Sequence, residues 1–258
     1  RTAEKQRSSE NRAQAVPARE FTIIYEDDAL LVIDKPAGVA VHGGSGVSFG
    51  VIEQIRRARP EARYLELVHR LDKDTSGLLM IAKKRNALVK LHEAIRNDHP
   101  KKIYLALGVG KLPNDSFHVK LPLFKYTGAQ GEKMVRVSED GQSAHTIFRV
   151  LNRFSDDLLH QVGLSQLTLV QATLKTGRTH QIRVHLQSQH CPIAGDERYG
   201  DYQANKRLQK LGLKRMFLHA AELHLDHPLT GEKLILKAPL PQDLAQFVLM
   251  LENARKVV

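Results

Sequence analysis

The segment VHRLDKDTSGLLMIAKK, from Val68 to Lys84, carries the strongest structural signal in the sequence. Its first half is polar. Its second half, from Gly77 to Ala82, is a continuous apolar run of the length typical of a buried strand. The segment therefore predicts a polar loop that leads directly into a rigid strand, and such a loop is well suited to fixing a reactive carboxylate.

The sequence on either side has the pattern of an α+β protein. Short apolar or alternating runs predict strands at 21–25, 30–33, 103–109, 144–150, 167–174, 216–225 and 234–237. Helical spacing predicts helices at 48–59, with Ser48 as N-cap, and at 86–97, 179–189 and 242–254. The polar stretch 111–142 predicts a hairpin insertion. Strands outnumber helices without alternating with them, which favours a mainly antiparallel mixed sheet with flanking helices over a doubly wound fold.

Length and composition favour one compact catalytic domain. The chain has 258 residues, 42% of them hydrophobic and 26% charged, which is enough apolar material for a sizeable core. Residues 1–20 are polar and basic and predict a flexible linker, so residues 21–258 are expected to form the catalytic domain. No window approaches the length of an apolar membrane span, and a single cysteine excludes an internal disulfide; both favour a cytoplasmic protein.

The charge balance points to a polyanionic partner. Lys and Arg number 39 against 28 Asp and Glu, a formal charge of +11, which favours nucleic acid ahead of an anionic membrane surface. Aromatic residues make up only 5% and Trp is absent, so folded RNA suits the chain better than extended single strands. The basic runs at 56–63, 83–90 and 206–215 either follow phosphates or are solvated helix faces.

The polar loop before the apolar run has two interpretations. It places His69, Arg70, Asp72 and Asp74 within six residues, and either carboxylate suits acid–base or nucleophilic chemistry. In the plain structural interpretation, the loop is a turn before a strand: Asp72 or Asp74 accepts backbone N–H bonds and Gly77 takes an unusual backbone angle.

A second cluster lies in LKTGRTHQIRVHL, residues 174–186. Arg178, His180, Arg183 and His185 crowd the beginning of a predicted helix, where N–H groups favour anions. For His180 and His185 we favour a solvated helix face. Arg183 lies within an apolar stretch and is expected to seek a carboxylate, for which Asp72 is the candidate.

Three spaced motifs resemble those of the RluA-type pseudouridine synthases. They are HRLDKDTSG at 69–77, DKPAG at 34–38 and the segment 174–186. Further matches, VHGGSG at 41–46, AGDERYGD at 194–201 and FLHAAEL at 217–223, are similar to the branch of this family that modifies large-subunit ribosomal RNA. The resemblance extends from about residue 21 to the C-terminal helix.

The resemblance implies an enzyme that isomerises uridines of 23S ribosomal RNA to pseudouridine without a cofactor or metal. It also implies an S4-like RNA-binding domain upstream, and we expect a monomer. The catalytic roles fall to Asp72 as the essential carboxylate, Tyr104 as the residue that stacks on the base and removes its C5 proton, and Arg183 as the partner of the aspartate.

The remaining expected site residues contact substrate or RNA. Arg70 resembles the arginine that enters the RNA helix in place of the flipped base. Ile182 and Leu218 resemble apolar pocket positions. The other polar residues expected to contact RNA are His69, Arg178 and His180.

Three alternatives remain open from the residues alone. Asp72-Lys73-Asp74 could be a DxD site that holds a divalent ion in a nucleotide-sugar transferase, although the sequence has no Gly-rich phosphate loop to support it. Asp72 with Asp34 or Glu222 could form the carboxylate pair of a glycoside hydrolase. A non-catalytic ribosome-binding or RNA-binding protein would also explain the charge.

Overall fold

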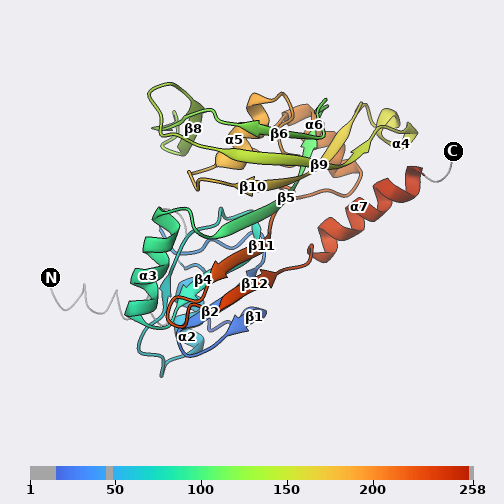
Figure 1. Cartoon of the computed structure of the whole chain (residues 1–258). Helices are drawn as coiled ribbons and strands as arrows, with labels where there is room; N and C mark the ends of the chain where they lie inside the picture. Colours follow the sequence, from blue (N-terminus) through green and yellow to red (C-terminus); the bar gives the residue numbers. More distant parts are fainter. Residues whose placement is uncertain (1–15, 45–48, 256–258) are drawn as a thin grey trace. The chain divides into compact units, whose positions relative to one another are not determined.

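A computed structural model describes residues 16–44 and 49–255 of the chain (Figure 1). The chain divides into two compact units, Arg1–Asn97 with Asp226–Glu232, and Asp98–Leu225 with Lys233–Val258. Most of the predicted linker, and the predicted N-cap Ser48, lie outside the described residues. The last linker residues are held by the first unit: Arg19 N donates to Gln54 O at 3.2 Å, and Glu20 pairs with Arg59 at 2.8 Å.

The described part of the first unit consists of antiparallel strands and two helices. Its strands are β1 (Ile23–Glu26), β2 (Leu30–Lys35), β3 (Glu66–Leu67) and β4 (Ser76–Ala82), and its helices are α2 (Val51–Ala58) and α3 (Arg85–Arg96). The strands follow the order β1-β2-β4, with β3 also paired to β4. Every residue of β4 is buried, which explains why its sequence is continuously apolar from Gly77 to Ala82 and does not alternate.

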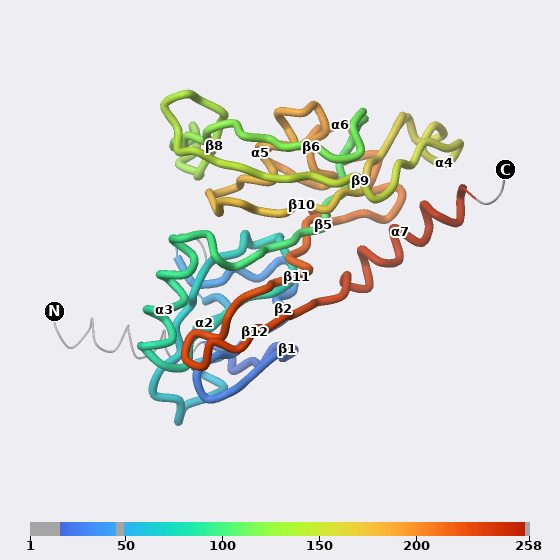
Figure 2. Tube along the Cα trace, viewed as in Figure 1, coloured from blue at the N-terminus to red at the C-terminus, as the bar shows by residue number. Residues whose placement is uncertain are grey.

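A segment from far along the chain completes this unit. Residues 226–232, orange-red in Figure 2, lie beside the blue strands of the first unit. His227 Nε2 is 2.7 Å from Asp27 Oδ2, across 200 residues of sequence. The acidic turn between β1 and β2 is therefore a structural anchor.

The second unit is built on a longer series of mainly antiparallel strands. Its strands β12-β11-β5-β10-β9-β6 are neighbours in that order. Their bounds are β5 (Lys101–Val109), β6 (Ser116–Val119), β9 (Thr146–Phe154), β10 (Leu167–Leu174), β11 (Leu218–Asp226) and β12 (Lys233–Lys237). The predicted hairpin insertion is β7 (Leu123–Thr127) with β8 (Lys133–Val137), a separate two-stranded sheet. Strand β6 precedes it and joins the main sheet.

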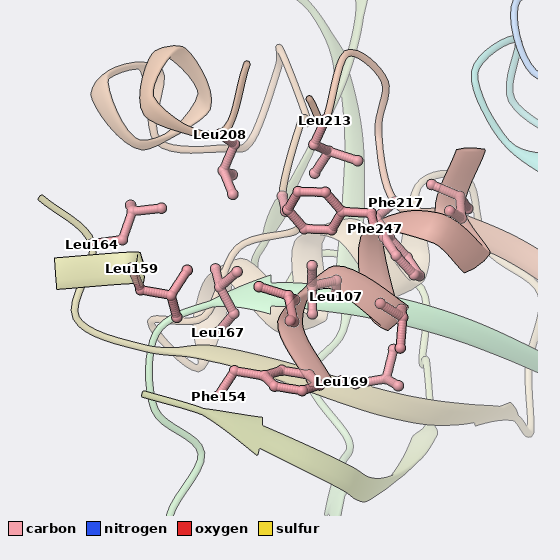
Figure 3. Packing of buried hydrophobic residues seen from close by; sticks show 14 of the residues in the cluster. Leu107, Phe154, Leu159, Leu164, Leu167, Leu169, Leu208, Leu213, Phe217 and Phe247 are labelled. Carbon is pink, nitrogen blue, oxygen red and sulfur yellow. The ribbon is translucent and has the colours of Figure 1, made fainter. Parts of the chain in front are cut away.

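Four helices accompany this sheet: α4 (Asp157–Gln161), α5 (Gln181–Ser188), α6 (Tyr202–Lys210) and α7 (Gln242–Arg255). Figure 3 shows an apolar cluster of this unit, in which Leu107 of β5, Phe154 of β9 and Phe247 of α7 pack with Phe217. Leu107, Phe154 and Phe217 are fully buried, and each such side chain stabilises the fold by roughly 1.5–3 kcal/mol. This core supports the strands that position the candidate site.

The predicted α+β class with a mainly antiparallel sheet is confirmed. Two helices escaped prediction, because α4 has only five residues and α6 buries only Ala204 and Leu208. The first predicted helix begins later than expected. Its N-cap is Gly50, whose N–H donates to Glu53 Oε2 at 3.2 Å, and its C-cap is Arg59.

Candidate active site

In the first unit, Lys35 joins the two motif loops. Its side chain is fully buried, and Nζ donates to the carbonyl oxygens of Pro36 and Val39 at 2.8 Å and of Lys73 at 2.9 Å. Gly38 N donates to the same Lys73 oxygen at 2.9 Å. The DKPAG loop and the HRLD loop are therefore held together immediately beside Asp72.

The loop that carries Asp72 is a turn before a strand, as the plain structural interpretation predicted. Thr75 N donates to the Asp72 carbonyl oxygen at 3.0 Å, and Gly77 has a φ of +115°. His69 is part of the support, since its Nε2 accepts a 3.0 Å bond from Met80 N of β4. This geometry is compatible with a reactive carboxylate at Asp72, which is half-buried, whereas Asp74 is exposed.

In the second unit, the structure brings Tyr104, Ile182 and Leu218 into one apolar cluster. Tyr104 lies on β5 between two alanines, Ala172 of β10 and Ala220 of β11. Because alanine is short, the neighbouring strands place no large side chain directly beside the tyrosine. Ile182 and Leu218 are each 4% exposed, so they are buried apolar side chains in the cluster against which the partly exposed Tyr104 ring packs.

Arg183 has a buried carboxylate partner that the sequence did not identify. Its Nε and Nη2 donate to Asp196 Oδ2 and Oδ1, both at 2.8 Å, and its Cζ is 5.0 Å from the centre of the Tyr199 ring. Burial alone would raise the pKa of Asp196, but the Arg183 bonds reverse this and hold the pKa below its usual value. The only sequence signal for Asp196 was its place in the AGDERYGD motif.

Two further polar residues of the segment 174–186, His180 and Arg178, make intramolecular bonds. His180, in the left-handed region with a φ of 54°, has Nδ1 2.6 Å from Tyr199 Oη. Arg178 Nε donates to Ser143 O at 2.9 Å.

The predicted solvated position of His185 is wrong. Its side chain is fully buried, with Nε2 2.9 Å from Leu121 O and Nδ1 2.8 Å from Thr146 Oγ1. Burial lowers its pKa, which favours the neutral ring. In that form, Nε2 donates to the carbonyl and Nδ1 accepts from the hydroxyl, so His185 supports the fold.

The described residues include neither a membrane-spanning helix nor a cluster of metal-ligating side chains. None of the helices in ranges 16–44 and 49–255 has the length and apolar character needed to cross a membrane. Within these same ranges, no three or more His, Cys, Asp and Glu side chains are grouped so that they could hold a metal ion.

The comparisons with known proteins agree with this fold and these motifs. Residues 29–188 match the family described as RNA pseudouridylate synthase. The chain is 49% identical over 244 residues to ribosomal large subunit pseudouridine synthase C of Escherichia coli strain K12, covering 94% of this chain and 73% of that protein. The corresponding Pasteurella multocida protein is 49% identical over 229 residues, covering 89% and 67%.

A solved structure supports the same assignment. Human RNA pseudouridylate synthase domain containing 4 superposes with a TM-score of 0.70 at 28% identity, covering 90% of this chain and 93% of that one. The chain thus belongs to the RNA pseudouridylate synthase family, and is an isomerase. Among its relatives are the proteins named ribosomal large subunit pseudouridine synthase C, which confirms the branch that the motifs indicated.

Proposed function

We propose that this protein isomerises specific uridines of 23S ribosomal RNA to pseudouridine in the cytoplasm, acting as a monomer without a cofactor. The observation that carries the proposal is 49% identity, over 94% of the chain, to an enzyme named for the ribosomal large subunit. The formal charge of +11 supports an RNA substrate. Because the family match at residues 29–188 extends through parts of both units, we treat residues 21–258 as one catalytic domain.

The reaction breaks the N1–C1′ bond and joins C5 to C1′ of the same nucleotide. We assign the essential carboxylate to Asp72, which either attacks C1′ or removes the C2′ proton, and both routes require the ionised acid. The bond from Lys35 Nζ to the Lys73 carbonyl oxygen supports this assignment, because it fixes the backbone that orients the Asp72 carboxylate. Arg183 serves the same reaction as the cation that keeps the acid ionised.

Tyr104 is assigned to stack on the uracil and to remove the C5 proton. Its place between two alanines, beside the buried Ile182 and Leu218, supports a flat apolar surface suited to a base. The target base must leave its stack before reaction, which costs a few kcal/mol. Arg70, exposed two residues before Asp72, is assigned to occupy the space that the base leaves. His69, Arg178 and His180 are assigned to the surrounding RNA contact.

The test is to incubate the protein with unmodified large-subunit RNA and to map new pseudouridines by chemical labelling and primer extension. Asp72→Asn is expected to abolish product while RNA affinity stays within about threefold of wild type, because the change removes only the carboxylate charge. Asp74→Asn is the matched control, since it makes the same change two residues away and should remain active.

The same assay separates the alternatives. Full activity in chelator argues against a DxD metal site at Asp72 and Asp74. Absence of pseudouridine in RNA treated with the wild-type protein, together with tight RNA binding, would support a non-catalytic RNA-binding protein. If pseudouridine formed only in transfer RNA, the proposed reaction would stand but the proposed ribosomal RNA substrate would be wrong. Light scattering during gel filtration measures the molar mass in solution and so tests whether the protein is a monomer.

A further inference from the structure

The loop between α5 and α6 supplies two buried residues that hold the Arg183 guanidinium. Asp196 is 1% exposed and accepts two bonds from the arginine, one from Nε and one from Nη2, each at 2.8 Å. Tyr199 is 4% exposed, and the centre of its ring lies 5.0 Å from Arg183 Cζ. A bidentate pair fixes the plane as well as the position of a guanidinium, and the ring adds a favourable cation–π contact.

The Asp196 carboxylate is itself fixed. Its Oδ1 also accepts the N–H groups of Arg198 at 3.0 Å and Tyr199 at 3.1 Å. Asn205 of α6 braces the backbone on both sides, since Nδ2 donates to Asp196 O and Oδ1 accepts from Gly195 N, each at 2.9 Å. The carboxylate cannot rotate away from Arg183 without breaking several of these bonds.

Tyr199 is held at its hydroxyl as well. Oη accepts from Val135 N of β8 at 2.9 Å and lies 2.6 Å from His180 Nδ1. Since the phenol has one proton, it donates to His180 while it accepts from Val135. The ring that faces Arg183 is therefore connected both to the β7–β8 sheet and to His180, the N-cap of α5.

We propose that Asp196 and Tyr199 are positioning residues that orient the Arg183 guanidinium for catalysis and act on the reaction only through it. The inference rests on the proposed function, in which Arg183 serves the reaction. Arginine has many rotamers, and a cation that must be ordered at the moment of reaction contributes less than one already aimed. The buried Asp196 charge also compensates the buried guanidinium, which permits a cation at a position only 7% exposed.

The main test variant is Asp196→Asn. Asparagine keeps the side-chain size and an oxygen for the two loop N–H groups, but it lacks the charge and the second acceptor for Arg183. The matched control is Asp201→Asn, which alters a carboxylate in the same region whose Oδ1 caps α6 by accepting from Ala204 N at 2.9 Å.

The primary readout is the single-turnover rate of pseudouridine formation. Asp196→Asn should lower it about 10- to 100-fold, as expected for a misplaced catalytic group, with RNA affinity within about threefold of wild type. Asp201→Asn should stay within about threefold in both quantities. An Asp196→Asn enzyme as fast as the control would overturn the inference.

A double-mutant cycle separates positioning from general support of the fold. If Asp196 acts through Arg183, adding Asp196→Asn to Arg183→Met should cause no further loss of rate, because the group being positioned is already absent. A merely structural role predicts the same loss in both backgrounds, and that result contradicts the proposal.

Asp196→Asn could fail to fold, which would be seen as the absence of a cooperative unfolding transition. In that case Tyr199→Phe provides the test. It keeps the ring beside Arg183 and removes the two hydroxyl bonds. We expect about a 3- to 10-fold slower single turnover in the wild-type background and no further change with Arg183→Met. Equal losses in both backgrounds overturn the inference. A wild-type protein that forms no pseudouridine overturns the proposed function itself, and the inference with it.

Discussion

Lys35 Nζ donates a 2.9 Å hydrogen bond to the carbonyl oxygen of Lys73, the residue that follows Asp72. The ammonium group also bonds two carbonyls of its own loop at 2.8 Å, and the side chain has no exposed surface. A charged lysine at a buried position is costly unless it is well bonded. Its bonds here connect the end of β2 to the loop that carries the proposed catalytic acid.

Lys35→Met should therefore lower the free energy of unfolding by about 2–4 kcal/mol, because the carbonyls lose a charged donor in a buried place. Lys73→Met is the control. The Lys73 side chain is exposed and only its backbone oxygen takes part, so a change within about 0.5 kcal/mol is expected. Urea denaturation of both variants measures the difference. Equal stabilities would show that the Lys35 bonds contribute nothing.

The predictable parts of the fold are the helices and strands that have a clear apolar pattern in their own sequence. Strand β10 was predicted with the bounds that the structure shows, and β4 differed by one residue. β4 is buried throughout and apolar from Gly77 to Ala82, and β10 is rich in apolar and β-branched residues and is buried along its first half. Helix α6 was not predicted, because its few apolar positions are surrounded by charged and amide side chains.

The motifs indicated candidate site residues but not the contacts that those residues make. The structure holds Tyr104, Ile182 and Leu218 in one apolar cluster, and Asp196 was not among the predicted site residues. Its pairing with Arg183 depends on the path of the loop after α5, which no local pattern encodes. His185 was misplaced for the same reason, since its partners are 39 and 64 residues away in sequence.

The anchor at Asp27 should make stability depend on pH. Burial opposes ionisation of this carboxyl, but bonds from Tyr25 Oη, the N–H groups of Ala29 and Leu30, and His227 outweigh it and lower its pKa from 3.8 to about 2. A lowered pKa in the folded state gives stability that is present above the unfolded value and is lost as pH falls through the folded value. The wild-type protein should therefore lose stability between about pH 4 and pH 2.

Asp27→Asn should be less stable than wild type at pH 7, and the gap should narrow as pH falls across this window. Asp28→Asn, at the exposed neighbouring residue, should keep the wild-type pH dependence. Thermal unfolding in a series of buffers from neutral to acid measures both. If the stability of Asp27→Asn changes with pH in parallel with that of wild type between about pH 4 and pH 2, the carboxylate bonds do not stabilise the fold.

Thr75 should tolerate loss of its hydroxyl. The side chain is buried, and within the described residues its Oγ1 has no hydrogen-bond partner. Valine has the same shape without the unsatisfied oxygen, so Thr75→Val should raise the free energy of unfolding by about 1 kcal/mol. Thr75→Ser keeps the hydroxyl and removes a buried methyl, so it should lower stability by about 1 kcal/mol. A Thr75→Val protein less stable than wild type would indicate a partner for the hydroxyl.

Gly195, which precedes the buried Asp196, should not accept a side chain. It has a φ of +81°, and a Cβ there would overlap the carbonyl oxygen of Arg215. Gly212 is the matched control, since its φ is +99° but nothing lies within 4 Å of a Cβ. Gly212→Ala should cost about 1–2 kcal/mol for the backbone conformation alone, whereas Gly195→Ala should cost at least about 1–3 kcal/mol more for the overlap. Denaturant unfolding gives both values; equal losses would mean that the Arg215 backbone moves away freely, and the loop that holds Asp196 would then be less rigid than its hydrogen bonds indicate.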